Sequence, residues 1–192
     1  RISSTTSILM TTAIPSGACR MTRAARAVID LDALRHNLQR AHTADPGAKQ
    51  YAVIKANGYG HGLVQVAQAL ADKAAGEGDD AKTMADGFAV ACLEEAVQLR
   101  EAGISQPILL LEGFFHADEL ADIQHHNLEI VVHHEAQLVA LESVPPADGE
   151  SGLRVWLKVD TGMHRLGFST SEAPAIWQRL AACAAVQQPP RL

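Results

Sequence analysis

The chain has 192 residues, of which 47% are hydrophobic and 20% are charged, and its formal net charge is −6. This composition is typical of a globular protein with a sizeable core, and no apolar run is long enough to cross a bilayer. The mildly acidic balance offers no electrostatic footprint for DNA or RNA, so we expect neither nucleic acid nor a membrane as a partner.

The N-terminal residues are not predicted to belong to the folded domain. Residues 1–20 are rich in serine and threonine and contain no acidic residue, as in transit peptides, whereas Met21 reads as a natural start. We therefore expect residues 1–26 to be a disordered or non-native extension and residues 27–192 to form the folded domain.

Cysteine and histidine spacing gives no indication of a metal centre. The three cysteines are far apart, which favours free thiols in a reducing compartment such as the cytoplasm. The pairs His125-His126 and His133-His134 place adjacent side chains on different sides of an element, so we expect no metal site.

From residue 27 onward the chain alternates short apolar runs with amphipathic segments. An exposed insertion is expected at 74–87, where glycine and aspartate gather. Asp30 or Asp32 can cap the first helix, and Gly103 and Asn127 can end later ones. Strands are predicted at 27–29, 51–54, 88–91, 107–111, 128–132 and 153–159, and helices from Asp30 or Asp32 onward and at 63–71, 93–102, 117–125, 135–141 and 172–185.

This alternation gives about five βα units from residue 51 onward, which predicts an α/β fold with a parallel sheet. An open doubly wound sheet can be complete with about five strands, whereas a closed (β/α)8 barrel needs eight strands and ~250 residues. The pattern alone leaves both architectures open, and a barrel would be cut short.

The first dense motif is the stretch AVIKANGYGHG at residues 52–62. Lys55 would lie at the carboxyl end of a buried strand, where desolvation can make an amine nucleophilic, although a single lysine at a strand end more often reaches water. The glycine-rich loop leads into a helix near Leu63, whose free N–H groups could hold a phosphate. An amine beside an anion site points to a phosphorylated aldehyde cofactor.

The second motif is LRVWLKVDTGMHRLG at residues 153–167. Strand alternation puts Trp156, Lys158 and Asp160 on one face, and the ends of parallel strands meet at the same mouth of a barrel. Arg165 follows on a turn, and its guanidinium suits a carboxylate or a phenolate. The alternatives are a solvated Arg165 and a Lys158 paired with Asp160 or Glu112.

Both motifs closely resemble those of the bacterial alanine racemases, and the match runs from about residue 27 to residue 192. The family folds as an N-terminal (β/α)8 barrel of the TIM type followed by a C-terminal β domain, and works as a head-to-tail homodimer. The resemblance therefore implies a barrel that is incomplete in this chain, without the C-terminal β domain.

The resemblance also assigns roles to individual residues. Lys55 would carry pyridoxal 5′-phosphate and act as a base, and Tyr59 would bind its phosphate. Arg165 would contact the cofactor's phenolic oxygen and the carboxylate of the substrate alanine, and Lys158 matches a position that is carbamylated in many members. The implied reaction interconverts L-alanine and D-alanine, either to supply D-alanine for the cell wall or to catabolise alanine.

One part of the family's machinery has no match in this chain. Inversion needs an acid or base on the other face of Cα, and the family uses a tyrosine from the partner's C-terminal domain. Tyr51 and Tyr59 do not match it, so we expect the isolated chain to be inactive. The alternatives are a non-catalytic barrel protein that binds or buffers pyridoxal phosphate, and an open-sheet binding domain without a cofactor.

Overall fold

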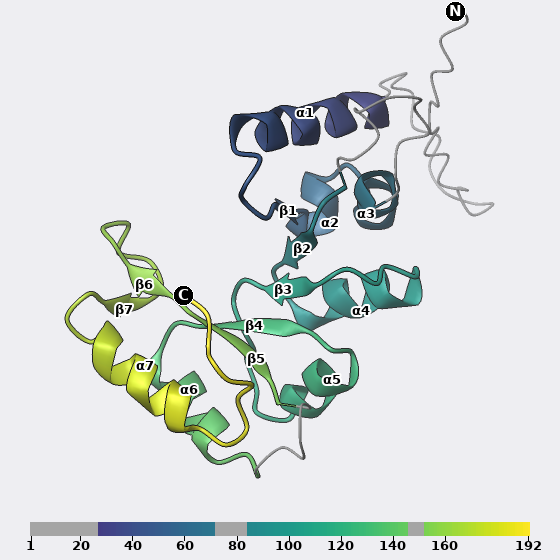
Figure 1. Ribbon diagram of the computed structural model, residues 1–192. Helices are drawn as coiled ribbons and strands as arrows, with labels where there is room; N and C mark the ends of the chain where they lie inside the picture. Colours follow the sequence, from purple (N-terminus) through teal and green to yellow (C-terminus); the bar gives the residue numbers. More distant parts are fainter. Residues whose placement is uncertain (1–26, 72–83, 146–151) are drawn as a thin grey trace, which may run out of the picture.

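The computed structural model describes residues 27–71, 84–145 and 152–192. Its framework is a parallel sheet of five strands in the order β1-β2-β3-β4-β5, with a separate two-stranded parallel sheet of β6 and β7 (Figure 1). The strands are Tyr51–Val53 (β1), Gly87–Val90 (β2), Ile108–Leu110 (β3), Glu129–Val132 (β4), Arg154–Leu157 (β5), Val159–Asp160 (β6) and Phe168–Ser169 (β7).

Seven helical segments connect or flank these strands in the described part of the chain. Asp30 caps the first of them, because its carboxylate accepts hydrogen bonds from the N–H groups of Asp32 and Ala33. The segments are Leu31–Ala44 (α1), Lys55–Tyr59 (α2), Leu63–Ala71 (α3), Leu93–Glu101 (α4), Glu119–His125 (α5), Glu135–Glu142 (α6) and Ala173–Ala182 (α7).

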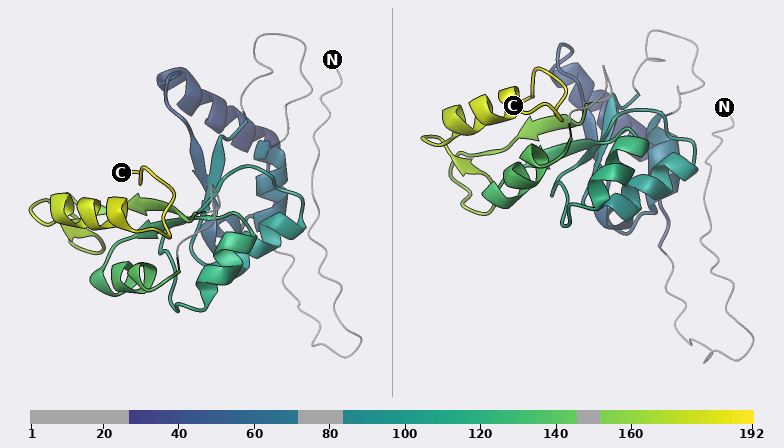
Figure 2. Two further views of the ribbon diagram at one scale, coloured as in Figure 1. Left: turned by 60° about the horizontal axis from the view of Figure 1, so that its bottom comes forward. Right: turned by 90° about the horizontal axis from the view of Figure 1, so that it is seen from below.

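The strand order separates the two architectures that the sequence left open. The strands of the main sheet follow chain order without a reversal, so the sheet has no switch point of the kind found in doubly wound folds. In the left view of Figure 2 the longer helices follow one another in an arc around the strands. The prediction of an incomplete α/β barrel is confirmed, and the open doubly wound sheet is excluded.

The outer face of the sheet is covered by the helices, whereas the inner face is covered only in part (Figure 2). Phe88, Ile108 and Ile130 point toward the helices and are fully buried, whereas Val53 on the inner face is 43% exposed. Alternation along a strand sends successive side chains to opposite faces, so the inner face of the curved sheet carries the residues that can form a site.

The edge of β5 that does not face β4 is paired with the C-terminal segment of the chain. Residues 185–192 run parallel to it, with bonds of 2.8 Å from the N–H of Leu153 to the carbonyl of Ala185 and from the N–H of Leu157 to the carbonyl of Arg191. At the opposite edge β1 pairs only with β2 among the described residues.

Most predicted elements match the structure within a few residues, and α3 has the predicted bounds. Gly103 and Asn127 adopt the left-handed conformation after α4 and α5, with φ of 85° and 51°. The strand predicted at 27–29 is wrong: this segment pairs with no strand in the described part of the chain, and Val28 is 63% exposed. This short apolar run is followed directly by Asp30, the N-terminal cap of α1.

Two predictions fall wholly or partly outside the described residues. The N-terminal extension at 1–26 lies outside them, as does the proposed insertion up to residue 83. The end of that insertion does not fit the prediction, because Ala85 is 1% exposed and Gly87 begins β2. Within 27–71, 84–145 and 152–192, no helix has the length and apolar content needed to cross a membrane.

Candidate active site

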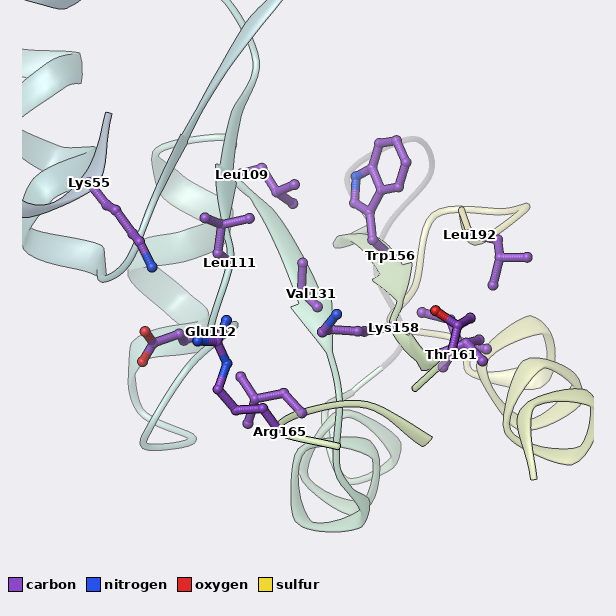
Figure 3. A pocket seen from close by; sticks show the side chains of 13 residues that line it. Lys55, Leu109, Leu111, Glu112, Val131, Trp156, Lys158, Thr161, Arg165 and Leu192 are labelled. Carbon is purple, nitrogen blue, oxygen red and sulfur yellow. The ribbon is translucent and has the colours of Figure 1, made fainter. Parts of the chain in front are cut away.

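A cavity of about 900 Å³ opens on the inner face of the main sheet, toward the carboxyl ends of its strands (Figure 3). Catalytic groups of parallel barrels gather at this end. The cavity combines apolar walls with four charged side chains. It is lined by Lys55, Leu109, Leu111, Glu112, Val131, Trp156, Leu157, Lys158, Val159, Thr161, Arg165, Leu166 and Leu192.

Three cationic side chains from separate segments meet in this cavity. Lys55 follows β1, Lys158 follows β5, and Arg165 lies in the turn between β6 and β7 (Figure 3). None of the three forms a salt bridge with a carboxylate in the described part of the chain. With Glu112 as one acidic lining residue, the charges of these side chains sum to about +2 at neutral pH, which favours an anionic ligand.

The turn that carries Lys55 has an unusual backbone. Ala56, Asn57, Gly58 and Tyr59 all adopt left-handed conformations, with φ of 54°, 55°, 62° and 53°. This conformation costs about 1–2 kcal/mol for each residue that has a Cβ, and strain of this kind concentrates at functional sites. The strand of Lys55 therefore ends in one left-handed helical turn.

The turn is closed by its own backbone hydrogen bonds. The N–H of Gly58 donates to the carbonyl of Ile54 (2.7 Å), and the N–H of Gly60 donates to the carbonyl of Ala56 (3.0 Å). Asn57 Oδ1 accepts the N–H of Leu63 (2.9 Å), the first residue of α3. The N–H of Leu63 is therefore engaged by the turn itself, and the predicted phosphate site at the start of α3 stays a prediction.

Tyr59 does not lie with the other predicted site residues. It is 59% exposed and is not among the residues that line the cavity. The structure thus brings together Lys55, Lys158 and Arg165, whereas the predicted role of Tyr59 at a phosphate stays a prediction.

Asp160 stabilises the turn that presents Arg165. One carboxylate oxygen accepts the N–H groups of Gly162 (2.9 Å) and His164 (3.0 Å), and the other lies 3.0 Å from His164 Nδ1. These two backbone hydrogen bonds are the main reason why the pKa of Asp160 lies below its usual value. Asp160 is therefore occupied within its own turn, and the alternative in which it pairs with Lys158 is not realised.

The apolar residues that line the cavity lie outside the two sequence motifs and were not predicted, apart from those of residues 153–167. Leu109 on β3 is in register with Glu129 on β4, which places Leu111 and Val131 on the same inner face. Alternation along those two strands could have identified them, but it gives no such signal for Glu112, which lies two residues past the end of β3. Trp156 was assigned to the correct face.

A buried carboxylate lies on the same face, farther from the mouth of the barrel. Glu129 is 0% exposed and accepts hydrogen bonds from Trp156 Nε1 (2.7 Å), Arg191 (2.8 Å) and the hydroxyl of Tyr51 (3.2 Å). Burial and the neighbouring Glu129 raise the pKa of Tyr51, so its hydroxyl remains a donor. This network fixes Trp156, which forms part of the cavity wall.

The main chain of Glu112 is held by two side chains of the β4–α6 segment. Gln137 Nε2 donates to the carbonyls of Glu112 (2.9 Å) and Phe114 (3.1 Å), while its oxygen accepts the N–H of His133 (3.0 Å). His133 Nε2 also lies 3.0 Å from the carbonyl of Glu112. Since a carbonyl only accepts, Nε2 carries the proton, and the buried Nδ1 has no partner in the described residues.

His133 is expected to make the stability of the fold depend on pH. Burial lowers its pKa, so the unfolded chain takes up a proton near pH 6.5 while the folded protein resists protonation until a lower pH. The stabilisation is complete above about pH 6.5 and is lost as the pH falls from that value toward the lowered pKa. His133→Gln should therefore reduce the decline in urea midpoint between about pH 7 and 5.5, whereas the exposed His125→Gln should leave it unchanged. Equal slopes for the wild type and His133→Gln would contradict this assignment.

Comparisons with known proteins find similar sequences over most of the chain. The model of the alanine racemase N-terminal domain matches residues 29–188. The chain is 50% identical over 167 residues to the biosynthetic alanine racemase of Escherichia coli O6:H1, which covers 87% of the chain and 42% of that relative. It is 54% identical over 160 residues to the alanine racemase of Pseudomonas syringae pv. syringae, which covers 83% of the chain and 41% of the relative.

Solved structures show the same similarity. The biosynthetic alanine racemase of Pseudomonas aeruginosa superposes with a TM-score of 0.69 at 42% identity, over 81% of this chain and 40% of the other. A histidine racemase from Leuconostoc mesenteroides gives a TM-score of 0.63 at 27% identity, over 81% and 39%. The chain thus spans about two fifths of the length of these relatives. With the family model matching nearly all of the described residues, the chain belongs to the alanine racemase family through its N-terminal domain.

Proposed function

We propose that this chain is the lysine-bearing barrel portion of a pyridoxal phosphate-dependent racemase that interconverts L-alanine and D-alanine. The observation that carries the proposal is the convergence of Lys55, Lys158 and Arg165 in one cavity, without carboxylate partners in the described part of the chain. Relatives named alanine racemase at about 50% identity support alanine as the substrate. We also propose the cytoplasm as its location.

The residues of the cavity fit pyridoxal phosphate. A primary amine is required to bind its aldehyde, and the excess of cationic side chains matches its phenolate and phosphate. Leu109, Leu111 and Val131 offer an apolar wall for an aromatic ring. Lys55 would hold the cofactor covalently, Arg165 would bind its phenolic oxygen, and Tyr59 would reach its phosphate. When bound, the cofactor supplies the electron-accepting ring that stabilises negative charge at the substrate Cα.

The side chains of this chain then have distinct tasks. Arg165 is proposed to orient the substrate through its carboxylate, since a guanidinium can donate two parallel hydrogen bonds. The amine of Lys55 is proposed to remove the Cα proton, or return it, on one face. Carbamylation of Lys158, a cation with no salt bridge in the described residues, would convert its charge to negative and hold Arg165 in place.

The other face of Cα needs a second acid or base. Tyr51 donates its hydroxyl to Glu129, and Tyr59 does not line the cavity, so neither tyrosine of this sequence is in a position to serve. We propose that the second group is a tyrosine of a C-terminal β domain, supplied by the partner subunit of a homodimer. Residues 27–192 would then provide half of the acid–base machinery.

The test is the formation of D-alanine from L-alanine by a protein that contains this chain and has the length of its relatives. With added pyridoxal phosphate we expect racemisation in both directions. The 192-residue polypeptide assayed alongside should be inactive, because it lacks the second proton carrier. Binding of the cofactor by the longer protein without racemisation would contradict the proposal and favour a non-catalytic pyridoxal phosphate-binding barrel instead.

A further inference from the structure

The left-handed turn that carries Lys55 is tied to the neighbouring βα unit by one carboxylate. Glu95, in the first turn of α4, accepts the N–H of Asn57 with Oε1 (3.2 Å) and the N–H of Ala91 with Oε2 (3.0 Å). Ala91 directly follows β2, the strand that pairs with β1. A single side chain thus connects the end of β2 to the turn behind Lys55.

This contact differs in kind from the other hydrogen bonds of the turn. Those of Gly58 and Gly60 close the turn on itself, and the side chain of Asn57 ties it forward to α3. Among the described residues, Glu95 is the one side chain from another βα unit that bonds this backbone. It therefore ties the turn to the end of β2, in addition to the backbone bond from the N–H of Ile54 to the carbonyl of Ala89 (2.9 Å).

We propose that Glu95 is a positioning residue for Lys55: its carboxylate holds Asn57 and thereby sets the direction in which the lysine amine enters the cavity. The proposal rests on the proposed function, in which Lys55 is the proton carrier. Both carboxylate oxygens are acceptors, so Glu95 satisfies two N–H donors at once. A glutamine in its place offers one acceptor and turns an N–H₂ group toward the second donor.

The test compares Glu95→Gln with Glu94→Gln in the full racemase. Glu94 precedes Glu95 on the same first turn of α4 but is exposed and bonds neither Asn57 nor Ala91. The first readout is amide hydrogen exchange without cofactor, which does not depend on racemase activity. We expect at least about tenfold faster exchange in residues 56–60 for Glu95→Gln and no change for Glu94→Gln, because a lost anchor raises the population of the opened turn.

The second readout separates positioning from substrate binding. A small misplacement of a catalytic group can cost up to about 10²-fold in rate, so we expect kcat for Glu95→Gln to fall by about ten- to a hundredfold. The KM for alanine should change less than about threefold, because Arg165 binds the carboxylate independently. Glu94→Gln should retain wild-type kcat.

Two outcomes would overturn the proposal. If faster exchange is confined to α4, Glu95 acts only as a cap of that helix. If residues 56–60 exchange faster while kcat is retained, the turn does not set the position of Lys55. Should Glu95→Gln fold poorly, Glu95→Asp keeps the charge near α4 but shortens the side chain, and the same pattern in exchange is expected. The exchange result stands even if the protein proves not to racemise alanine, so the two hypotheses can fail separately.

Discussion

Replacement of Lys55 by alanine is expected to lower kcat for alanine racemisation by about 10³-fold in the full-length enzyme. Removal of a positioned acid–base group costs about 10²–10⁴-fold, and Lys55 is also the proposed covalent attachment point of the cofactor. The loss should appear in both directions, since the same amine removes the Cα proton of one enantiomer and delivers it to the other.

The matched control is Lys49→Ala, which removes an exposed lysine six residues earlier in the loop before β1. Both variants lose one positive charge, but only Lys55 lines the cavity. Absorbance of the lysine-bound cofactor and mass analysis after borohydride reduction would show the attachment site. Racemisation at the wild-type rate by Lys55→Ala, or attachment at another lysine, would refute the assignment.

The βα units from residue 51 onward could be predicted because the sequence features that indicate them are local and recur along the chain. Apolar runs of strand length alternate with amphipathic segments, and left-handed residues such as Gly103 mark helix ends. The false strand at 27–29 shows the limit of this approach. A short apolar run cannot reveal whether a neighbouring strand is present, and among the described residues Val28 has none.

The site was predictable only where its chemistry is unusual. Lys55, Lys158 and Arg165 could be identified because they lie in two dense motifs that together resemble those of the alanine racemases, whereas each residue alone more often has a structural explanation. Leu109 and Val131 did not stand out, because an apolar residue in a strand fits either face of a sheet until the register is known. The left-handed conformation of Ala56 was not predictable at all, since alanine disfavours it and only the surrounding bonds impose it.

Gly113→Ala is expected to destabilise the protein by about 3–5 kcal/mol, far more than an ordinary glycine replacement. A Cβ at this position would lie 2.3 Å from the carbonyl oxygen of Val131 and 2.5 Å from Gln137 Nε2. Gln137 is 2% exposed and holds the carbonyls on both sides of Gly113. Overpacking costs about 1–3 kcal/mol and each buried polar group left without a partner about 1–3 kcal/mol.

Gly103→Ala is the control that isolates the steric part of this effect. Gly113 and Gly103 both have positive φ, 68° and 85°, but a Cβ at Gly103 meets nothing within 4 Å. Both replacements therefore carry the left-handed cost of about 1–2 kcal/mol and the same restriction of the unfolded chain, and these contributions cancel in the difference. Urea unfolding at constant m-value would measure that difference, expected to be about 2–3 kcal/mol. Equal midpoints would mean that Val131 and Gln137 can move aside without cost. In that case the bonds of Gln137 would not fix the backbone of Glu112, and the position of that carboxylate in the cavity would need another explanation.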